Sequence, residues 1–306
     1  MDAVAKKYRY ITKECLFCNS TNEADHPIVY QKNFRDEDLD AGVFSARRTA
    51  DHFHYDMVRC SKTGLLFSRH ILDDEALNEL YKGSVVTFGE QTEFIKRDYW
   101  RPIADKVGGW QRKRALDIGC SNGFFMEVLK DNGYEEVHGV EPGTEPKAIA
   151  RADIRDNIYT GFYGPGLYPE NHFDLITCFQ TLDHLSDPLG MLRNMLYNTK
   201  PGGHVYMIMH NTNALQAKIF GERSPIIDVE HIYLFNKENL SELCRKAGFK
   251  VTSVFDVKNG YPMSYWVRMS PLPMKKMWVG TLKVLGMYEK MLDINAGNMG
   301  IILEKV

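Results

Sequence analysis

Two acid–histidine pairs in the second half of the chain have the residue types that acid–base chemistry needs. Asp183 directly precedes His184, and Glu230 directly precedes His231. Because histidine titrates near neutral pH, it can accept a proton from a reacting group under physiological conditions. Each pair is therefore a candidate for proton transfer, although neighbours in sequence need not touch. The alternative for each is a structural histidine that bonds a backbone carbonyl.

A glycine-containing stretch, ALDIGCSNGFF at residues 115–125, is a candidate ligand-binding turn. Gly119 and Gly123 lie between an apolar run that contains Asp117 and the start of a helical pattern. Glycine allows the backbone to bend tightly or to approach a ligand closely. The stretch lacks two of the three glycines of a dinucleotide-binding turn, and it lacks the lysine of a P-loop. It is therefore not expected to hold a phosphate chain. The alternative is that both glycines serve strand–helix packing alone.

Segments typical of strands and helices alternate from residue 114 onward and must position these residues. Strands are expected at 114–119, 137–142, 157–163, 173–180, 202–211, 250–257 and 298–305. Helices are expected at 124–133, 187–199 and 236–249. This alternation predicts an α/β fold with a doubly wound, mainly parallel seven-stranded sheet, Rossmann-like in character. Such sheets bind ligands outside the carboxyl ends of their strands, where the glycine turn and the Asp183–His184 pair are expected.

The chain divides into three parts of different texture. Residues 1–70 contain half of the cysteines, and residues 71–110 are expected to form a helical linker or cap. Residues 111–306 are expected to form the α/β domain, with a helical insertion at 258–298. The apolar helix expected near 274–292 in this insertion could be a dimer face, a substrate lid or core packing. Four aromatic residues of the cap are candidates for lining an acceptor pocket: Tyr81, Phe88, Tyr99 and Trp100.

Composition limits the class of protein. Of the 306 residues, 44% are hydrophobic and 25% are charged, and the net charge of −2 gives no general attraction to nucleic acid. No apolar run approaches the length of about 18 residues that a membrane span needs. The N-terminus lacks the apolar core of a signal peptide. Six cysteines in a chain of this length are typical of free thiols in a reducing compartment, so a cytoplasmic location is expected.

The glycine turn, combined with Glu141 at the end of the next strand, resembles motif I of the class I S-adenosylmethionine-dependent methyltransferases. Three later segments, HFDLITCFQTLDHL, LYNTKPGGHVYMI and LSELCRKAGFKV, resemble further elements of that family in the same order, so the resemblance spans about residues 114–255. It implies S-adenosyl-L-methionine as the cofactor, with Glu141 accepting its ribose hydroxyls. The implied cofactor-binding residues are Asp117, Gly119, Cys120, Ser121, Gly123, Glu141, Phe179 and Gln180. Ser121 departs from the family, which often has glycine there.

The second acid–histidine pair is similar to one in sugar C-methyltransferases that act on nucleotide-linked keto-deoxysugars. In that subgroup, a Glu-His pair with aromatic residues soon after it supplies the catalytic base, and a histidine follows the fourth strand. The resemblance implies His231 as the base with Glu230 beside it, and His184 as a substrate contact. This chain has Asp-Val where the subgroup often has Tyr-His before the pair. The residues leave methylation of carbon and methylation of oxygen both open.

The segment after the fourth strand also resembles one in the quinone-biosynthesis O-methyltransferases. In those enzymes a Glu-x-x-Glu-His run can hold a divalent metal. The equivalent run here extends from Gln180 to His184. Since Gln180 replaces a charged ligand, no metal is expected at this run.

Three cysteines near the N-terminus have metal-ligand spacing. Cys15 and Cys18 form a C-x-x-C pair, and Cys60 follows in CSKTG. The sugar C-methyltransferase subgroup opens with a similar zinc domain, whose second pair reads C-x-x-C-G, so Thr63 stands where a fourth cysteine is expected. Because structural zinc takes four ligands, a histidine would have to complete the site. The candidates are His26, His52, His54 and His70, and the alternative is a site that no longer binds metal.

These observations predict a methyltransferase that acts on a small carbohydrate or nucleotide-linked sugar, by base-assisted in-line transfer to carbon or oxygen. O-methylation of a natural product or lipid precursor is the alternative among enzymes. A nucleic-acid-modifying or nucleic-acid-binding protein with a zinc ribbon is the alternative of another class. The net charge and the missing fourth cysteine disfavour it, so no nucleic-acid partner is expected. The oligomeric state stays open.

Overall fold

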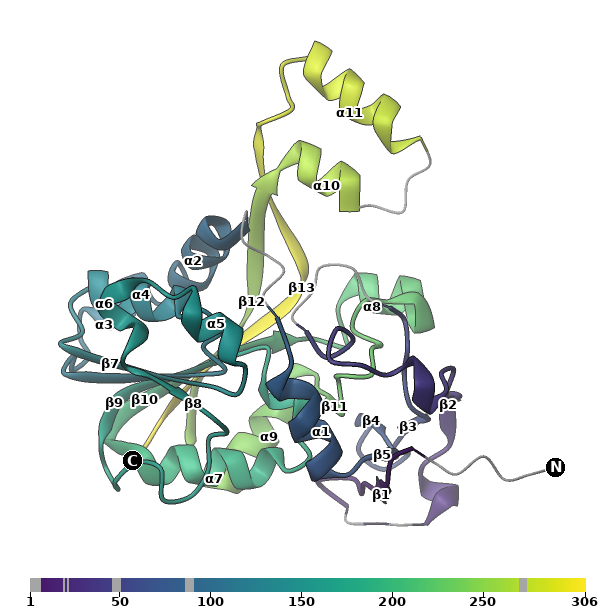
Figure 1. Cartoon of the computed structure of the whole chain (residues 1–306), viewed down its shortest axis with the longest axis horizontal. Coiled ribbons are helices and arrows are strands. Elements are labelled where there is room, and N and C mark those ends of the chain that lie inside the picture. Colours follow the sequence, from purple (N-terminus) through teal and green to yellow (C-terminus); the bar gives the residue numbers. More distant parts are fainter. Residues whose placement is uncertain (1–6, 19, 21, 46–50, 86–90, 270–273) are drawn as a thin grey trace.

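The computed structural model describes residues 7–18, 20, 22–45, 51–85, 91–269 and 274–306 (Figure 1). Its centre is a seven-stranded sheet with the strand order β12-β13-β10-β9-β6-β7-β8. The run from β10 to β8 is parallel, and β13 is antiparallel to both of its neighbours. The strands are β6 (Arg114–Ile118), β7 (Glu136–Glu141), β8 (Ile158–Thr160), β9 (Phe173–Phe179), β10 (Thr199–His210), β12 (Lys250–Pro262) and β13 (Met291–Glu304). The predicted mainly parallel α/β fold is therefore confirmed.

Alternate residues of the central strands face two separate hydrophobic cores. In β6, Leu116 and Ile118 join one core and Ala115 joins the other, as the two-residue repeat of a strand requires. The first core includes residues of α7 (Pro188–Asn198) and α9 (Lys237–Ala247). The second includes residues of α2 (Thr92–Trp100), α3 (Ala104–Val107), α4 (Phe124–Asp131) and α6 (Ala152–Arg155), while α5 (Thr144–Ala148) contacts β7 and β8. The sheet is thus covered on both faces.

Polar caps fix where the predicted helices begin. The Asp187 carboxylate accepts a hydrogen bond from the Gly190 amide at the start of α7, and Asn236 does the same for the Asn239 amide at the start of α9. Helix α1 (Asp74–Lys82) begins after Asp73, whose carboxylate accepts from the Ala76 amide. These caps explain why α7 and α9 begin where the sequence indicated and why α1 begins after Asp73.

The N-terminal part is built from two small sheets. Strands β1 (Tyr10–Thr12) and β5 (His70–Leu72) pair, and a second sheet has the order β11-β4-β3-β2. That sheet consists of β2 (Ile28–Tyr30), β3 (Met57–Arg59), β4 (Leu66–Ser68) and β11 (Tyr233–Leu234). Because β11 comes from the second half of the chain, the N-terminal sheet is joined directly to the segment that follows His231. Short 3-10 turns η1 (Glu23–Asp25) and η2 (Asp36–Asp38) connect these strands.

Strands β12 and β13 continue beyond the sheet as a two-stranded arm (Figure 1). The sequence predicted that β12 ends near residue 257 and that β13 begins near 298. Instead, pairing continues as far as Pro262 and Met291, so both strands carry the chain away from the body. Two helices, α10 (Met263–Met269) and α11 (Lys275–Val284), lie at the far end of the arm. Within the described residues, no helix is both long and apolar enough to cross a membrane.

Candidate active site

A cavity of about 500 Å³ lies at the carboxyl ends of the central parallel strands. It is lined by the residues that follow β6, β7, β9 and β10, as expected for an open α/β sheet. Five of the predicted cofactor-binding residues line it: Gly119, Ser121, Glu141, Phe179 and Gln180. Asp117, Cys120 and Gly123 lie behind this wall and do not line the cavity.

The turn after β6 needs glycine at two positions. Gly119 and Gly123 have φ angles of 70° and 76°, in the left-handed region that favours glycine. A Cβ atom on Gly119 would lie 2.3 Å from the Thr181 hydroxyl oxygen, and one on Gly123 would lie 2.6 Å from Ile154 Cδ1. The turn therefore depends on glycine for its conformation and for the close approach of neighbouring segments.

Glu141 presents a buried carboxylate on the cavity wall. Its Oε2 accepts a hydrogen bond from the Ser121 amide at 2.9 Å, and its Oε1 accepts one from the Gly143 amide at 3.0 Å. Burial raises the pKa of Glu141, and the two amides partly oppose that shift. Each oxygen keeps a second lone pair that can accept a hydroxyl donor, which suits a residue expected to bind a ribose diol.

Asp117 lies behind the turn and stabilises it. Its carboxylate is almost fully buried and accepts a hydrogen bond from the Thr177 hydroxyl at 2.6 Å, which joins β6 to β9. Burial raises the pKa of Asp117 to about 7, against the effect of that hydrogen bond. Cys120 is also fully buried, and its sulfur would contact any Cβ added at Gly139 of β7. Both residues shape the turn without lining the cavity.

The two acid–histidine pairs come together around Asp183, which lies in the 3-10 turn η4 (Leu182–His184). The Nε2 atom of His231 is 3.9 Å from Asp183 Oδ2, and that of His184 is 4.0 Å from Asp183 Oδ1. His210, at the end of β10, completes the group. The ring of His231 lies 4.9 Å from that of His184 and 5.0 Å from that of His210, measured between centroids.

Burial gives this histidine–aspartate cluster unusual protonation properties. Asp183 is only 1% exposed, and neither of its carboxylate oxygens makes a hydrogen bond to the part of the chain that the structure describes. Burial raises the pKa of Asp183 to about 7, and it lowers the pKa of His184 to about 3 and that of His210 to about 4. Both histidines are therefore neutral at physiological pH. Strongly shifted groups in a cavity are typical of functional sites.

The segment that carries His231 is held between η4 and the N-terminal sheet. The Ile232 amide donates to the Asp183 carbonyl at 2.8 Å, and the Ser68 amide donates to the Ile232 carbonyl at 2.8 Å. The Ser68 hydroxyl also donates to the His231 carbonyl at 3.2 Å. Glu230, the other half of the pair, is buried and lines the cavity. These bonds explain how two pairs that are far apart in sequence meet.

Several cavity residues were not predicted from the sequence. His210 pairs across the sheet with Asn298, whose side-chain amide donates to Asn259 Oδ1 at 3.1 Å. The Gln180 amide donates to Asn298 Oδ1 at 3.2 Å, and Gln180 has a φ angle of 48°. The place of His210 in the cavity could have been predicted, because a histidine that ends the fifth strand must lie at the ligand-binding edge of the sheet.

The predicted aromatic residues of the cap divide between cavity and core. Tyr81 and Tyr99 line the cavity, whereas Trp100 packs near Phe125 and Phe88 lies outside the described residues. The Tyr81 hydroxyl lies 3.4 Å from His184 Nδ1, and the two rings stack. Tyr81 therefore sets the orientation of His184.

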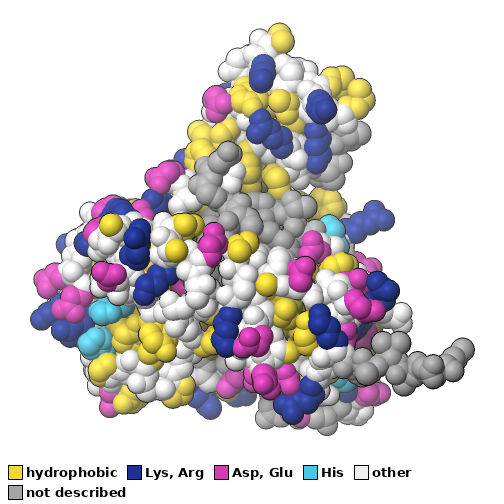
Figure 2. Space-filling model, viewed as in Figure 1, with side chains coloured by type: hydrophobic (Ala, Val, Ile, Leu, Met, Phe, Trp, Pro, Cys, Tyr) yellow, Lys and Arg dark blue, Asp and Glu magenta, His cyan; other side chains and the backbone are white. Residues whose placement is uncertain are grey.

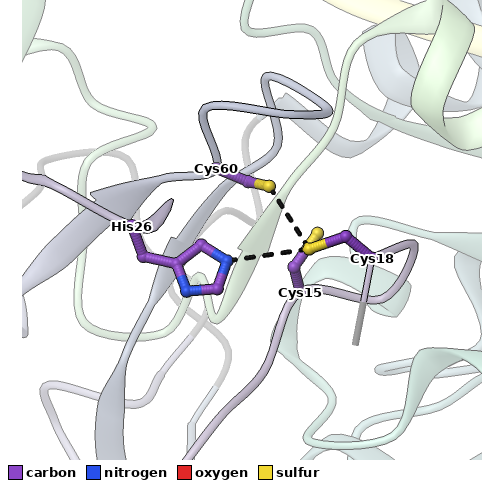
Figure 3. A group of neighbouring side chains, drawn as sticks. All are labelled: Cys15, Cys18, His26 and Cys60. Carbon is purple, nitrogen blue, oxygen red and sulfur yellow. Dashed lines mark hydrogen bonds between the residues drawn. The ribbon is translucent and has the colours of Figure 1, made fainter. Parts of the chain in front are cut away.

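Three cysteines and one histidine of the N-terminal part converge (Figure 3). The donor atoms of Cys15, Cys18, His26 and Cys60 all lie within 4.8 Å of one another. Cys18 Sγ is 3.6 Å from Cys60 Sγ and 3.8 Å from His26 Nε2. Thr63, which stands in place of a fourth cysteine, has its hydroxyl 3.3 Å from Cys15 Sγ. Three thiols and an imidazole are a ligand set that structural zinc takes, so these residues fit the ion.

The structure distinguishes between the histidines that the sequence offered as a fourth ligand. His26 is buried in the cluster. His54 points elsewhere, with Nε2 3.1 Å from Glu222 Oε1, and the Nδ1 of His70 lies against the Thr12 hydroxyl. A second group with metal-ligand distances is formed by Asp183, His210 and His231, whose donor atoms also lie within 4.8 Å of one another.

Comparisons with known proteins agree with this geometry. A family profile described as a methyltransferase domain matches residues 93–254, which is more than half of the chain. The ubiquinone biosynthesis O-methyltransferase of Cronobacter sakazakii is 32% identical over 118 residues, covering 37% of this chain and 48% of the relative. The corresponding protein of Aeromonas salmonicida is 33% identical over 118 residues, covering 36% and 49%. The chain thus spans about half the length of the curated relatives it matches.

Among solved structures, the chain is similar to an SAM-dependent methyltransferase from Archaeoglobus fulgidus, with 18% identity and a TM-score of 0.49 over 76% of this chain and all of that one. A second, from Aquifex aeolicus, has 15% identity and a TM-score of 0.45 over 77% of this chain and all of that one.

The buried carboxylate of Asp183 should make stability depend on pH. Its pKa of about 7 in the folded state exceeds the value of about 3.9 in an unfolded chain. The free energy of unfolding therefore falls as pH rises between those two values, because the folded state holds the proton more tightly. Asp183→Asn removes this loss. The melting temperature of the variant should therefore exceed that of the wild type by a larger margin at pH 8 than at pH 5.

Thermal unfolding followed by circular dichroism at the two pH values measures this difference. Asp105→Asn, at an exposed position, is the matched control and should show equal margins. A variant that is less stable at pH 8, and that loses a bound metal ion at the same time, would contradict this account and make Asp183 a metal ligand.

Proposed function

Because the chain belongs to the methyltransferase-domain family and is an SAM-dependent methyltransferase, we propose that it methylates a carbon or oxygen atom of a small carbohydrate or nucleotide-linked sugar. The observation that carries the proposal is one cavity lined both by the glycine turn with Glu141 and by His184 and His231. The predicted cofactor residues and the candidate base thus face the same space, which in-line transfer requires.

His231 is the proposed general base. When bound, S-adenosyl-L-methionine supplies a methyl group already activated by its sulfonium. The imidazole of His231 would take the proton from the acceptor as the acceptor atom bonds to the methyl carbon. The cofactor would supply the methyl group and leave as a thioether, which would keep the electron pair of the carbon–sulfur bond. The charge that forms on His231 then lies about 4 Å from the Asp183 carboxylate, which stabilises it in this buried setting.

Two further residues have proposed positioning roles. His184 is neutral and oriented by Tyr81, so it can hydrogen-bond an acceptor oxygen. Glu230 lies beside His231 on the same wall and can bind an acceptor hydroxyl. Tyrosine rings and asparagine amides elsewhere in the lining offer flat apolar faces and hydrogen-bonding groups, a combination that suits a sugar.

O-methylation of an aromatic or lipid precursor is the second candidate, and the curated relatives favour it. Those proteins are ubiquinone biosynthesis O-methyltransferases by name. The same base would remove the proton of an aromatic hydroxyl. An acceptor panel that contains both nucleotide sugars and catechols distinguishes the two.

The proposed role of Cys15, Cys18, His26 and Cys60 is to hold a structural zinc ion. The cluster joins the segment before β2 to the hairpin of β3 and β4, and β4 pairs with β11. A zinc ion would therefore stabilise the sheet that holds the backbone next to His231. With four protein ligands the site is closed, so its role is structural and not catalytic.

His231→Ala should lower methyl transfer by about 10²- to 10⁴-fold, the usual contribution of a general base. Affinity for S-adenosylhomocysteine should stay nearly unchanged, because the glycine turn and Glu141 are untouched. Transfer of labelled methyl from the cofactor to the acceptor panel measures the first quantity, and calorimetry measures the second. His70→Ala, at an exposed histidine, should retain full activity. Full activity of the His231 variant would remove its role as base.

Purified protein should contain about one zinc ion per chain, as measured by plasma mass spectrometry. His26→Ala and Cys60→Ser should lose most of the metal, whereas His26→Cys should keep it because a fourth thiolate replaces the imidazole. His70→Ala is again the control and should keep its zinc. Full zinc content in the His26→Ala variant, or none in the wild type from zinc-supplemented cultures, would refute the assignment.

A further inference from the structure

The tip of the arm, residues 263–292, differs in charge from the rest of the chain. It has five basic residues and one acidic residue, and so a net charge of +4 in a chain whose total is −2. The basic residues are Arg268, Lys275, Lys276, Lys283 and Lys290. Figure 2 shows basic and hydrophobic side chains interleaved over this tip.

Helix α11 at the tip exposes apolar side chains at helical spacing. Met277 and Trp278 lie in the helix and Met274 and Leu285 flank its two ends, and between 44% and 66% of each side chain is exposed. Only Leu282 of this helix is buried. Exposed apolar side chains that lie together mark a surface that another body covers.

The arm that carries this tip is fixed to the body. The Gly260 amide in β12 donates to Asp98 Oδ2 at 2.7 Å, and the Arg97 guanidinium donates to the Gly260 carbonyl at 2.5 Å. On the other strand, Arg101 and Asp293 form an ion pair at 2.6 Å. Helix α2 therefore holds both strands at the base of the arm, so the tip is presented in a defined position.

We propose that the tip of the arm docks on an anionic lipid surface. A helix with exposed apolar side chains and lysines around it is the pattern of a helix that lies in the membrane interface, where apolar side chains enter the headgroup region and lysines bind the lipid phosphates. Trp278 is the residue type that favours this boundary. A second copy of the chain is a less suitable occupant, because two tips of +4 repel one another.

Docking would also place the cavity near the lipid. Tyr261 and Tyr265 at the base of the tip line the cavity, and Tyr261 pairs across the arm with Leu292, an exposed residue of the tip. This arrangement suits an acceptor carried by a lipid. That last statement rests on the proposed methyl transfer, whereas binding of the tip to lipid does not.

Flotation of the full-length protein with phosphatidylglycerol vesicles, and with phosphatidylcholine vesicles for comparison, tests the proposal without cofactor or acceptor. The wild type should float with the anionic vesicles only, and less so as salt is raised. The double variant Lys276→Glu/Lys283→Glu should reduce binding by about tenfold or more, since lysines near an anionic surface contribute additively. Trp278→Ser/Leu285→Ser should also reduce it.

The matched control is Lys106→Glu/Lys113→Glu, which changes charge equally at exposed positions on the body and should bind as the wild type does. All variants should keep the wild-type melting temperature, so that misfolding is excluded. A wild type that does not float, or tip variants that bind normally, would overturn the proposal. So would a tip variant whose only change is a shift from dimer to monomer in gel filtration, because the occupant would then be a second copy. Loss of methyl transfer with normal flotation would affect the proposed function alone.

Discussion

The site depends on the backbone hydrogen bonds that hold residues 231–232 between η4 and β4. Through them the Asp183 carbonyl, the Ile232 amide and carbonyl, and the Ser68 amide form one continuous path from the catalytic domain to the N-terminal sheet. Because these bonds fix the backbone on both sides of the cluster, the imidazole of His231 stays about 4 Å from the buried Asp183 carboxylate. The N-terminal part is thus bonded directly to the segment that carries His231 of the candidate site.

The buried Asp183 carboxylate destabilises the folded state. A buried charge that makes no hydrogen bond to the described part of the chain is destabilising, and the neutral His184 and His210 do not offset this cost. The arrangement makes sense if the charge is used when a proton reaches His231. The proposed zinc ion would help to keep the site assembled, since it would stiffen the hairpin of β3 and β4.

The features that could be predicted from the sequence are those that depend on a few neighbouring residues. The starts of α7 and α9, and the alternation of strands and helices, could be predicted because each follows from a few adjacent residues. The meeting of Asp183 with His231 and His210, and the choice of His26 over His54, depend on how distant segments pack, so spacing alone could not give them. The arm was missed because strands β12 and β13 continue through pairing with each other, beyond the point where burial patterns mark a strand.

Binding of the cofactor product tests the central claim most directly. Calorimetric titration with S-adenosylhomocysteine should show one equivalent bound per chain, and Glu141→Ala should weaken binding strongly because its carboxylate is the predicted acceptor of the ribose hydroxyls. Asp131→Ala, at an exposed acid on the same domain, should bind as the wild type does. Absence of binding by a wild-type protein with an intact fold, or wild-type affinity in the Glu141 variant, would contradict the account.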